Sequence, residues 1–152
     1  MIDPQLASFL EEGIFIALAT RNERLEPNGA RVIAVAVEPD GAHLQAFLPA
    51  PAARDVLPDL ESNGQVAICF ARPPDERACQ IKGECAGTRD ASDEEREMVQ
   101  GQWDRWLDRL TTIGFDRATF AHWPSWPCVA VRVRVRAIFN QTPGPGAGGP
   151  LT

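Results

Sequence analysis

The sequence predicts a mainly β protein, a small antiparallel barrel of six strands with helices covering its open parts. Three observations lead to this fold class. Short β-rich runs alternate with turn residues through the first half of the chain, one long amphipathic pattern follows near residues 92–113, and a strictly alternating segment spans residues 128–140. With 152 residues the chain has the length of one domain, which we place at residues 1–140, before a Gly/Pro-rich tail at residues 141–152.

The N-terminal third has the features of one helix and three strands. Asp3 suits an N-cap, Pro4 the first helical position, and Gly13 a left-handed helix end. Three β-rich runs follow, with a polar turn after the first and an Asp-Gly hairpin turn after the second. We therefore expect antiparallel strands at residues 14–20, 30–37 and 43–49.

Residues 50–64 combine helical spacing with an internal proline. Because the ring of Pro58 blocks a hydrogen bond inside a helix, we expect this helix to be kinked or split there, with one or two turns on each side. Two more strands, at residues 65–71 and 77–87, flank the turn RPPDE. They bring the expected sheet to five strands.

A capping box formed by Ser92 and Glu95 opens the long helix near residues 92–113. Its apolar residues recur with the helical period on one face, and they are Val99, Trp103, Trp106, Leu107 and Leu110. Residues 128–140 then alternate valine with arginine, which predicts a sixth strand with one buried face. We expect its arginines to form a solvated face or interface ion pairs rather than ligand contacts. They are Arg132, Arg134 and Arg136.

Charge and composition exclude several classes of function. The chain has 15 basic and 21 acidic residues and a net charge of −6, which opposes binding to nucleic acid or to anionic membranes. No apolar run approaches the length of about 18 residues that a membrane span needs, and no secretory leader is recognisable, so we expect a cytoplasmic protein. The two histidines and four cysteines lack the spacing of metal ligands or of a disulfide framework, so we expect no metal site and reduced thiols.

The tail sequence GPGAGGP resembles a phosphate-binding glycine loop in composition only. Such a loop needs a following helix whose free N–H groups receive the anion, and only two residues follow here. Two alternatives remain for residues 141–152: a frayed tail, or an arm that lies across a neighbouring surface.

Several segments, taken in order, resemble one known family. They are IFIALAT, EPNGARVIAV, the Asp-Gly hairpin, DLESNGQVAICF and ERACQIKGECAG, with WP and CVAVRVRVRAIFNQ as the closing element. They resemble the pyridoxamine 5′-phosphate oxidase-like family of FMN-binding split β-barrels, mainly between Ile14 and Gly87. The resemblance implies a six-stranded antiparallel split β-barrel and a homodimer that binds FMN, or sometimes a deazaflavin or haem, in clefts at the subunit interface. It also implies two-electron redox chemistry on a small-molecule substrate.

The resemblance extends to individual residues of the cofactor site. Pro27 and Arg31 match the family pattern that opens the flavin-binding strand, in which the arginine holds the phosphate. Backbone groups of Val32, Ile33 and Ala34 would line the edge of the isoalloxazine ring.

The resemblance places four more residues at the same site. Phe47 and Leu48 lie near the end of the following strand, and Arg54 would take over the phosphate contact of the lysine that the family has at position 56. Trp126 would stack on the flavin or on a dimer partner. Each has a structural alternative: Arg31 as an edge-strand arginine, Arg54 as a helix-surface charge, and Trp126 as a packing residue, as also for Trp123.

Three departures from the family pattern favour an alternative function. Val56 stands where the family has a lysine, Ala78 stands where the oxidase has a flavin-contacting glutamine, and the C-terminal substrate motif of the oxidase is absent. They argue against vitamin B6 oxidation. The leading hypothesis is therefore an FMN-binding oxidoreductase of another specificity. The alternative is a non-enzymatic split-barrel dimer that has lost FMN or binds haem or a deazaflavin.

Overall fold

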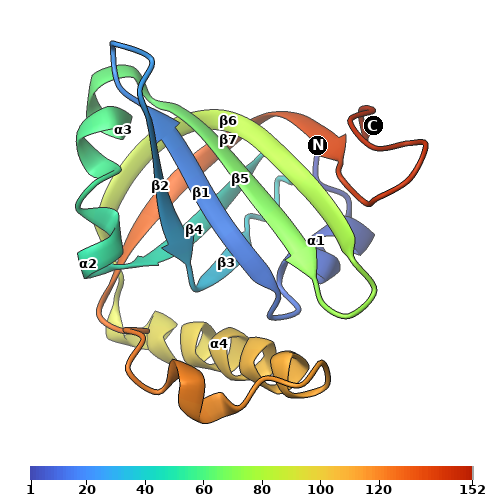
Figure 1. Ribbon diagram of the computed structural model, residues 1–152. Coiled ribbons are helices and arrows are strands. Elements are labelled where there is room, and N and C mark those ends of the chain that lie inside the picture. The colour runs from blue at the N-terminus through green and yellow to red at the C-terminus, as the bar shows by residue number, and fades with distance from the viewer. Residues whose placement is uncertain (152) are drawn as a thin grey trace.

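The computed structural model describes residues 1–151, in which a seven-stranded sheet curls into a barrel (Figure 1). All strand pairs are antiparallel, and the strand order is β2-β1-β5-β6-β7-β4-β3. The strands are β1 (Phe15–Arg21), β2 (Pro27–Val32), β3 (Ala34–Val37), β4 (His43–Pro49), β5 (Gln65–Arg72), β6 (Arg77–Asp90) and β7 (Cys128–Asn140). The predicted mainly β class is confirmed.

A break at Ile33 explains why the sheet has seven strands rather than six. The single strand expected at residues 30–37 begins earlier and divides there into β2 and β3. Val32 lies opposite Ile16 on β1, whereas Ala34 lies opposite Phe47 on β4. The two strands therefore stand at opposite ends of the sheet, and the chain between them closes the barrel.

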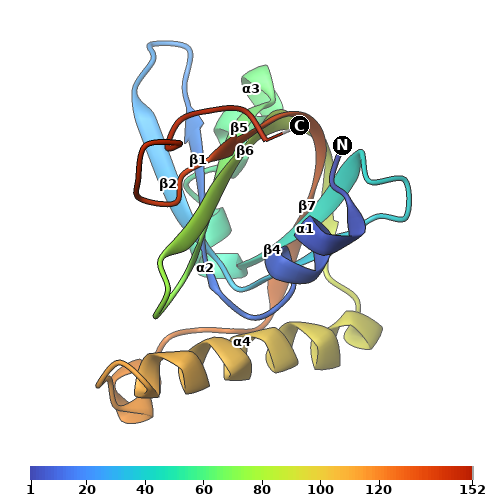
Figure 2. The ribbon, with the colours of Figure 1, turned by 90° about the vertical axis from the view of Figure 1, so that its right-hand side faces the viewer.

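The helices lie at the periphery of this barrel. They are α1 (Pro4–Leu10), α2 (Ala50–Ala53), α3 (Leu57–Asn63), the short 3₁₀ helices η1 (Asp93–Glu95) and η2 (Arg117–Phe120), and α4 (Arg96–Thr111). Figure 2 shows α1 beside one opening of the barrel and α4 as a separate layer along its outside. The long helix expected near residues 92–113 is thus confirmed, as η1 followed by α4.

The break between α2 and α3 is not at Pro58, where the sequence places it. α2 ends at Ala53, a turn follows at residues 54–56, and Pro58 lies in the first turn of α3. A first-turn proline breaks no hydrogen bond because that N–H has no partner inside the helix. Pro58 therefore starts a helix rather than kinking one.

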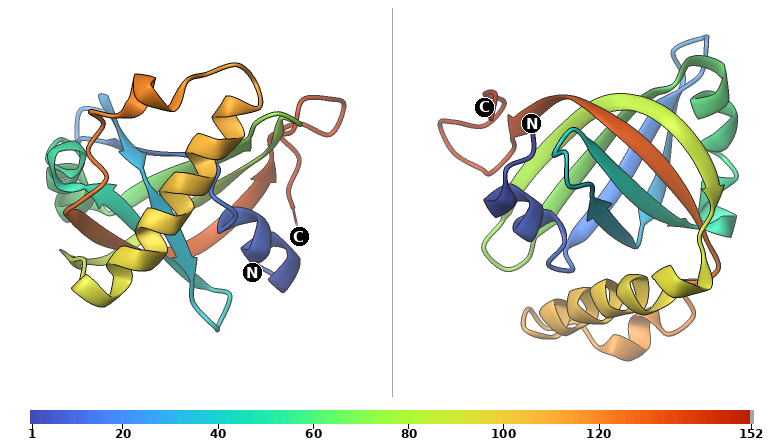
Figure 3. Two further views of the ribbon diagram at one scale, coloured as in Figure 1. Left: turned by 90° about the horizontal axis from the view of Figure 1, so that it is seen from below. Right: turned by 180° about the vertical axis from the view of Figure 1, so that it is seen from behind.

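Two apolar clusters form the core. One fills the barrel interior, and the other lies between α4 and the outer face of the sheet. In the second cluster Ile33, Ala34 and Phe47 are at most 3 % exposed. They pack with Trp103 and Trp106 of α4, so this helix covers the outer face of β3 and β4 (Figure 3).

Polar contacts hold α4 at the outer edge of β3, the last strand of the sheet. The side-chain amide of Gln102 donates to the Val35 carbonyl at 2.7 Å, and the Val35 N–H donates to Gln102 Oε1 at 3.1 Å. The N–H of Val37 donates to the Glu11 carboxylate at 2.6 Å. Side chains thus satisfy an edge that would otherwise be open to pairing with another chain.

The C-terminal tail folds back on its own strand up to Leu151. The N–H of Leu151 donates to the Ile138 carbonyl at 2.8 Å, and Phe139 and Pro150 form an isolated antiparallel bridge. Thr152 lies outside the described residues. Within residues 1–151, no helix combines the length and apolar character needed to cross a membrane.

We predict that Gly13→Ala destabilises the fold by about 1–3 kcal/mol, because it strains the backbone and separates α4 from the barrel. Gly13 has φ +81°, and an added Cβ would lie 2.5 Å from the Gln102 carbonyl oxygen and 2.7 Å from Arg105 Cβ. Chemical denaturation measures the effect. Gly114→Ala is the matched control, since it has φ +97° but open space around it. Equal losses in both variants would contradict a close approach at Gly13.

Candidate functional site

The residues that the resemblance places at a cofactor site do not all lie on one face of the sheet. Val32 and Leu48 point into the barrel interior, as members of the first core cluster. Ile33, Ala34 and Phe47 lie on the outer face beneath α4. The N–H of Ile33 donates to the Phe47 carbonyl at 2.8 Å, so this backbone amide is already used within the barrel.

Arg31 lies on the outer face of β2, opposite Ala17 of β1, and its side chain is enclosed by aromatic rings. Its guanidinium carbon is 3.9 Å from the centre of the Trp106 ring, which is a cation–π contact. The other rings around it are those of Phe15 at 4.7 Å, Trp103 at 5.8 Å and Trp123 at 6.0 Å.

Arg31 has no carboxylate partner within residues 1–151, and its Nε is buried without a hydrogen-bond acceptor. Burial lowers the pKa of its guanidinium to about 10, because the charged form loses hydration. The group therefore stays cationic at neutral pH. The indole Nε1 of Trp106 is a second buried donor without an acceptor in the same cluster. Both lack an acceptor, and an anion is the kind of group that would supply one.

Several other arginines of the protein are neutralised by acids on the same chain. Arg109 and Arg72 both contact Glu12 at 2.9 Å, which joins α4 to the barrel. Arg132 forms two hydrogen bonds with Glu38. The remaining arginines of β7, Arg134 and Arg136, share Glu84. The β7 arginines thus form a solvent-exposed face, one of the two expected arrangements, and the ion pairs on it lie within one chain rather than at an interface.

The structure does not gather the remaining predicted residues around Arg31. Arg54 is exposed between α2 and α3 and makes no ion pair within residues 1–151. Trp126 is half-buried against the α4 cluster, where its ring is 5.7 Å from the Arg96 guanidinium. Of Trp123 and Trp126, Trp123 is the one near Arg31, with its ring centre 6.0 Å from the guanidinium carbon.

The positions that depart from the family pattern have structural roles. Val56 is fully buried in the barrel core, so a lysine there would require a different path for this loop. Ala78 lies on β6, and its N–H donates to the Thr142 hydroxyl at 3.0 Å. The folded tail thus covers the backbone at this position.

Sequence reasoning assigned Trp103 and Trp106 only to an apolar helix face. That assignment is correct, because both are buried in the second core cluster. Their contact with Arg31 depends on how α4 crosses the sheet, which helical period does not specify. Two features of the sequence could have indicated this contact. One is the pair of tryptophans three residues apart on an apolar helix face, and the other is an arginine in a strand for which the sequence suggests no acidic partner.

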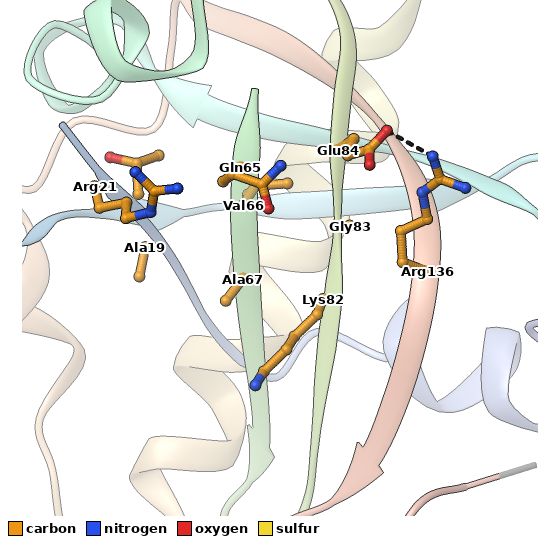
Figure 4. A pocket seen from close by; sticks show the side chains of 10 residues that line it. Ala19, Arg21, Gln65, Val66, Ala67, Lys82, Gly83, Glu84 and Arg136 are labelled. Atoms are coloured by element: carbon orange, nitrogen blue, oxygen red, sulfur yellow. Dashed lines mark hydrogen bonds and ion pairs between the residues drawn. The ribbon is translucent and has the colours of Figure 1, made fainter. Parts of the chain in front are cut away.

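A groove of about 410 Å³ lies elsewhere, on the outer face of β1, β5, β6 and β7 (Figure 4). Its floor is made of small residues, among them Ala19, Ala67 and Gly83. Arg136 at its rim is paired with Glu84 at 2.8 Å. None of the predicted cofactor-site residues lines this groove.

One cluster has the residue types of a metal site. Glu38, Asp40 and His43 place ligand atoms within 4.8 Å of one another. However, both Glu38 oxygens accept hydrogen bonds from Arg132, which lower the pKa of this carboxyl, and His43 Nδ1 is 2.7 Å from Asp40. These groups are already partnered.

Comparison with solved structures identifies the fold. HupZ of group A Streptococcus is similar with a TM-score of 0.57 and 16 % identity, covering 97 % of this chain and 100 % of that chain. An F420 reductase has a TM-score of 0.54 and 18 % identity, covering 86 % and 93 %. An FMN-binding protein of Syntrophomonas wolfei has a TM-score of 0.54 and 15 % identity, covering 87 % and 80 %.

These likenesses show the split β-barrel fold of pyridoxamine 5′-phosphate oxidase-like proteins. No protein-family model and no curated protein matches the sequence.

We predict that Arg31→Met does not lower the melting temperature, whereas Arg109→Met lowers it by about 2–4 °C. The first removes a buried charge that no acid neutralises. The second leaves Glu12 with one fewer partner and removes a hydrogen bond to the Gly13 carbonyl, a loss of about 1 kcal/mol in a domain of this size. Differential scanning calorimetry measures both. A fall for Arg31→Met as large as that for Arg109→Met would show that Arg31 has a structural role.

Proposed function

We propose that this protein, which has the split-barrel fold of pyridoxamine 5′-phosphate oxidase-like proteins, binds FMN and acts as a flavin-dependent oxidoreductase. The observation that carries the proposal is Arg31, a half-buried cation on β2 whose Nε is fully buried and which has no acid partner in residues 1–151. A guanidinium fork matches the oxygens of a phosphate and gains strength where water is excluded. In this proposal Arg31 holds the phosphate of the flavin nucleotide.

A flavin supplies hydride or electron transfer from its own ring system, so the protein needs only to bind, orient and shield it. This agrees with a site that is rich in aromatic side chains and offers one cation. Two proteins of similar fold support the class of ligand, because one is named as FMN-binding and another as an F420 reductase.

The site fits the phosphate of FMN better than its isoalloxazine ring. Arg31 offers a free cation for the phosphate. The outer face beside Ile33, Ala34 and Phe47 is already filled by α4, so a flavin ring does not fit there while α4 keeps this position. FMN binding through Arg31 therefore requires that aromatic residues at the border of this cluster give way.

A second candidate function follows from the same packing. Because α4 fills the face beside Ile33 and Val56 replaces a lysine of the family pattern, the chain also suits a split-barrel dimer without FMN. Such a protein would be non-enzymatic or would bind another ligand, with a deazaflavin or haem as the first to test.

We also propose that the protein is a homodimer that uses the outer face of β1, β5 and β6. Small residues dominate this face, among them Ala19, Ala67 and Cys69. The small residues of β1 and β5 leave room for another sheet to approach closely, whereas β6 presents longer side chains such as Lys82 on this face. All four cysteines are free thiols, which favours a reducing compartment such as the cytoplasm for this dimer.

We predict that FMN binds with a dissociation constant in the micromolar range or tighter, and that Arg31→Met weakens binding about ten-fold or more, equivalent to 1.4 kcal/mol. Quenching of flavin fluorescence measures it. Riboflavin lacks the phosphate, so its affinity should not respond to Arg31→Met. Arg24→Met is the control, because Arg24 is exposed on the neighbouring turn and pairs with Glu26.

Two results would count against this assignment. Equal effects of Arg31→Met on FMN and riboflavin would exclude phosphate recognition by Arg31. No binding at high micromolar FMN would favour the second candidate function, and haem and a deazaflavin would then be titrated.

We predict that light scattering gives twice the 16.6 kDa chain mass, and that Ala67→Arg shifts this species to the monomer. An arginine on this face would have to be desolvated at the interface without a partner. Glu61→Arg, at an exposed position on α3, is the control and should remain dimeric. A monomeric wild type would contradict the dimer, and a dimeric Ala67→Arg protein would place the interface elsewhere.

A further inference from the structure

Five aromatic side chains of α4 and the segment that follows it form a connected cluster. Figure 3 shows that this following segment, which contains η2, returns beside α4. The ring centres of Trp103 and Trp106 are 4.9 Å apart, and those of Trp106 and Phe120 are 5.2 Å apart. The ring centre of Phe120 is 5.2 Å from that of Trp123 and 6.2 Å from that of Phe115. We call these five residues the aromatic cluster.

The outer side of the aromatic cluster is an exposed apolar patch. Trp123 is 44 % exposed and Phe115 is 49 % exposed. Two further apolar side chains are exposed nearby. Ile113 precedes Phe115 by two residues, and the ring of Phe15 contacts the Arg31 guanidinium. Contiguous exposed aromatic surface beside a buried charge is typical of a binding site.

Trp123 lies beside the two residues that carry the buried donors, and it is not part of a helix or strand. It lies in the turn after η2, directly before Pro124, and its backbone N–H donates to the Phe120 carbonyl. Its ring centre is 6.3 Å from that of Trp106, with the two planes inclined by 28°, and 6.0 Å from the Arg31 guanidinium carbon. A planar ring at this place therefore faces both residues that carry an unsatisfied donor.

We propose that Trp123 occupies the place of a ligand, and that this ligand is a planar aromatic anion. Its ring takes the position of the Trp123 indole against Trp106, and its negative group accepts the hydrogen bonds that Arg31 and Trp106 leave unused. Exchange of one ring for another conserves most of the stacking, whereas the anion adds a charge-assisted pair that Trp123 cannot provide. The inference rests on the proposed function for its natural ligand, since FMN belongs to this chemical class.

The experiment uses pyrene-1-sulfonate, a planar fluorescent anion, and pyrene-1-methanol as the uncharged probe, with fluorescence anisotropy of the full-length protein as readout. We expect Trp123→Ala to tighten binding of the sulfonate about five-fold, or about 1 kcal/mol, because the internal ring no longer competes. Arg31→Met should weaken it about ten-fold and leave the methanol probe unaffected. Phe115→Ala is the matched control, since Phe115 contacts Phe120 but is not among the rings around Arg31.

Several outcomes would overturn the inference. Unchanged or weaker sulfonate binding in Trp123→Ala would show that Trp123 does not compete with the ligand, and equal tightening in Phe115→Ala would show a general loosening. Trp123→Gln is a second variant in case the alanine variant is unstable. Unfolding of both variants would assign Trp123 a structural role and likewise reject the proposal.

A parallel titration with FMN separates this inference from the proposed function. FMN binding that depends on Arg31 but does not respond to Trp123→Ala would keep the flavin function and reject the displacement of Trp123. Sulfonate binding with the expected responses to Arg31 and Trp123 substitutions, but no FMN binding, would keep the aromatic-anion site and reject FMN as its ligand.

Discussion

The pairing of the Gln102 side-chain amide with the backbone of Val35 is the contact on which the candidate site depends. It fixes α4 against the edge of β3, and Gly13 allows the helix to come close enough for these hydrogen bonds. Each hydrogen bond contributes only about 0.5–1.5 kcal/mol, but together they determine the height and rotation of the helix. The next residues on the same helix, Trp103 and Trp106, are thereby placed over Arg31.

Enclosing Arg31 costs hydration free energy, and the contacts within the fold do not fully offset this loss. The cation–π contacts offset about 0.5–2 kcal/mol of the lost hydration, yet Nε still has no acceptor and the pKa of the group remains lowered. Two other arginines near this site have hydrogen-bond acceptors. Arg105 and Arg109, both on α4, donate to backbone carbonyls of the loop before β1. A residue that conflicts with the local rules of stability, among neighbours that obey them, indicates a functional position.

Much of the fold followed from local pattern, whereas the site did not. Alternation and turn residues predicted β4 and β7 with the bounds found, and a helical period predicted α4. The break at Ile33 was missed because Ile33 and its immediate neighbours Val32 and Ala34 are all apolar, and only the closure of the barrel requires it. Pro58 was misplaced because a proline at a helix start and one at a kink look alike in sequence. The resemblance singled out Arg31, but its aromatic surroundings come from residues far along the chain.

Arg31 also connects the two surfaces that the fold leaves for function. Its Cα partner across β1 and β2 is Ala17, a small residue on the outer face that β1 shares with β5 and β6. α4 covers the outer face of β3 and β4, whereas the face of β1, β5 and β6 stays open, and this is the face that we propose for a second copy. A copy docked there would border Phe15 and the ring of Trp123. A ligand held by Arg31 would then lie at the edge of the dimer interface, where closure by the partner excludes water and strengthens the pairing of the anion with its guanidinium.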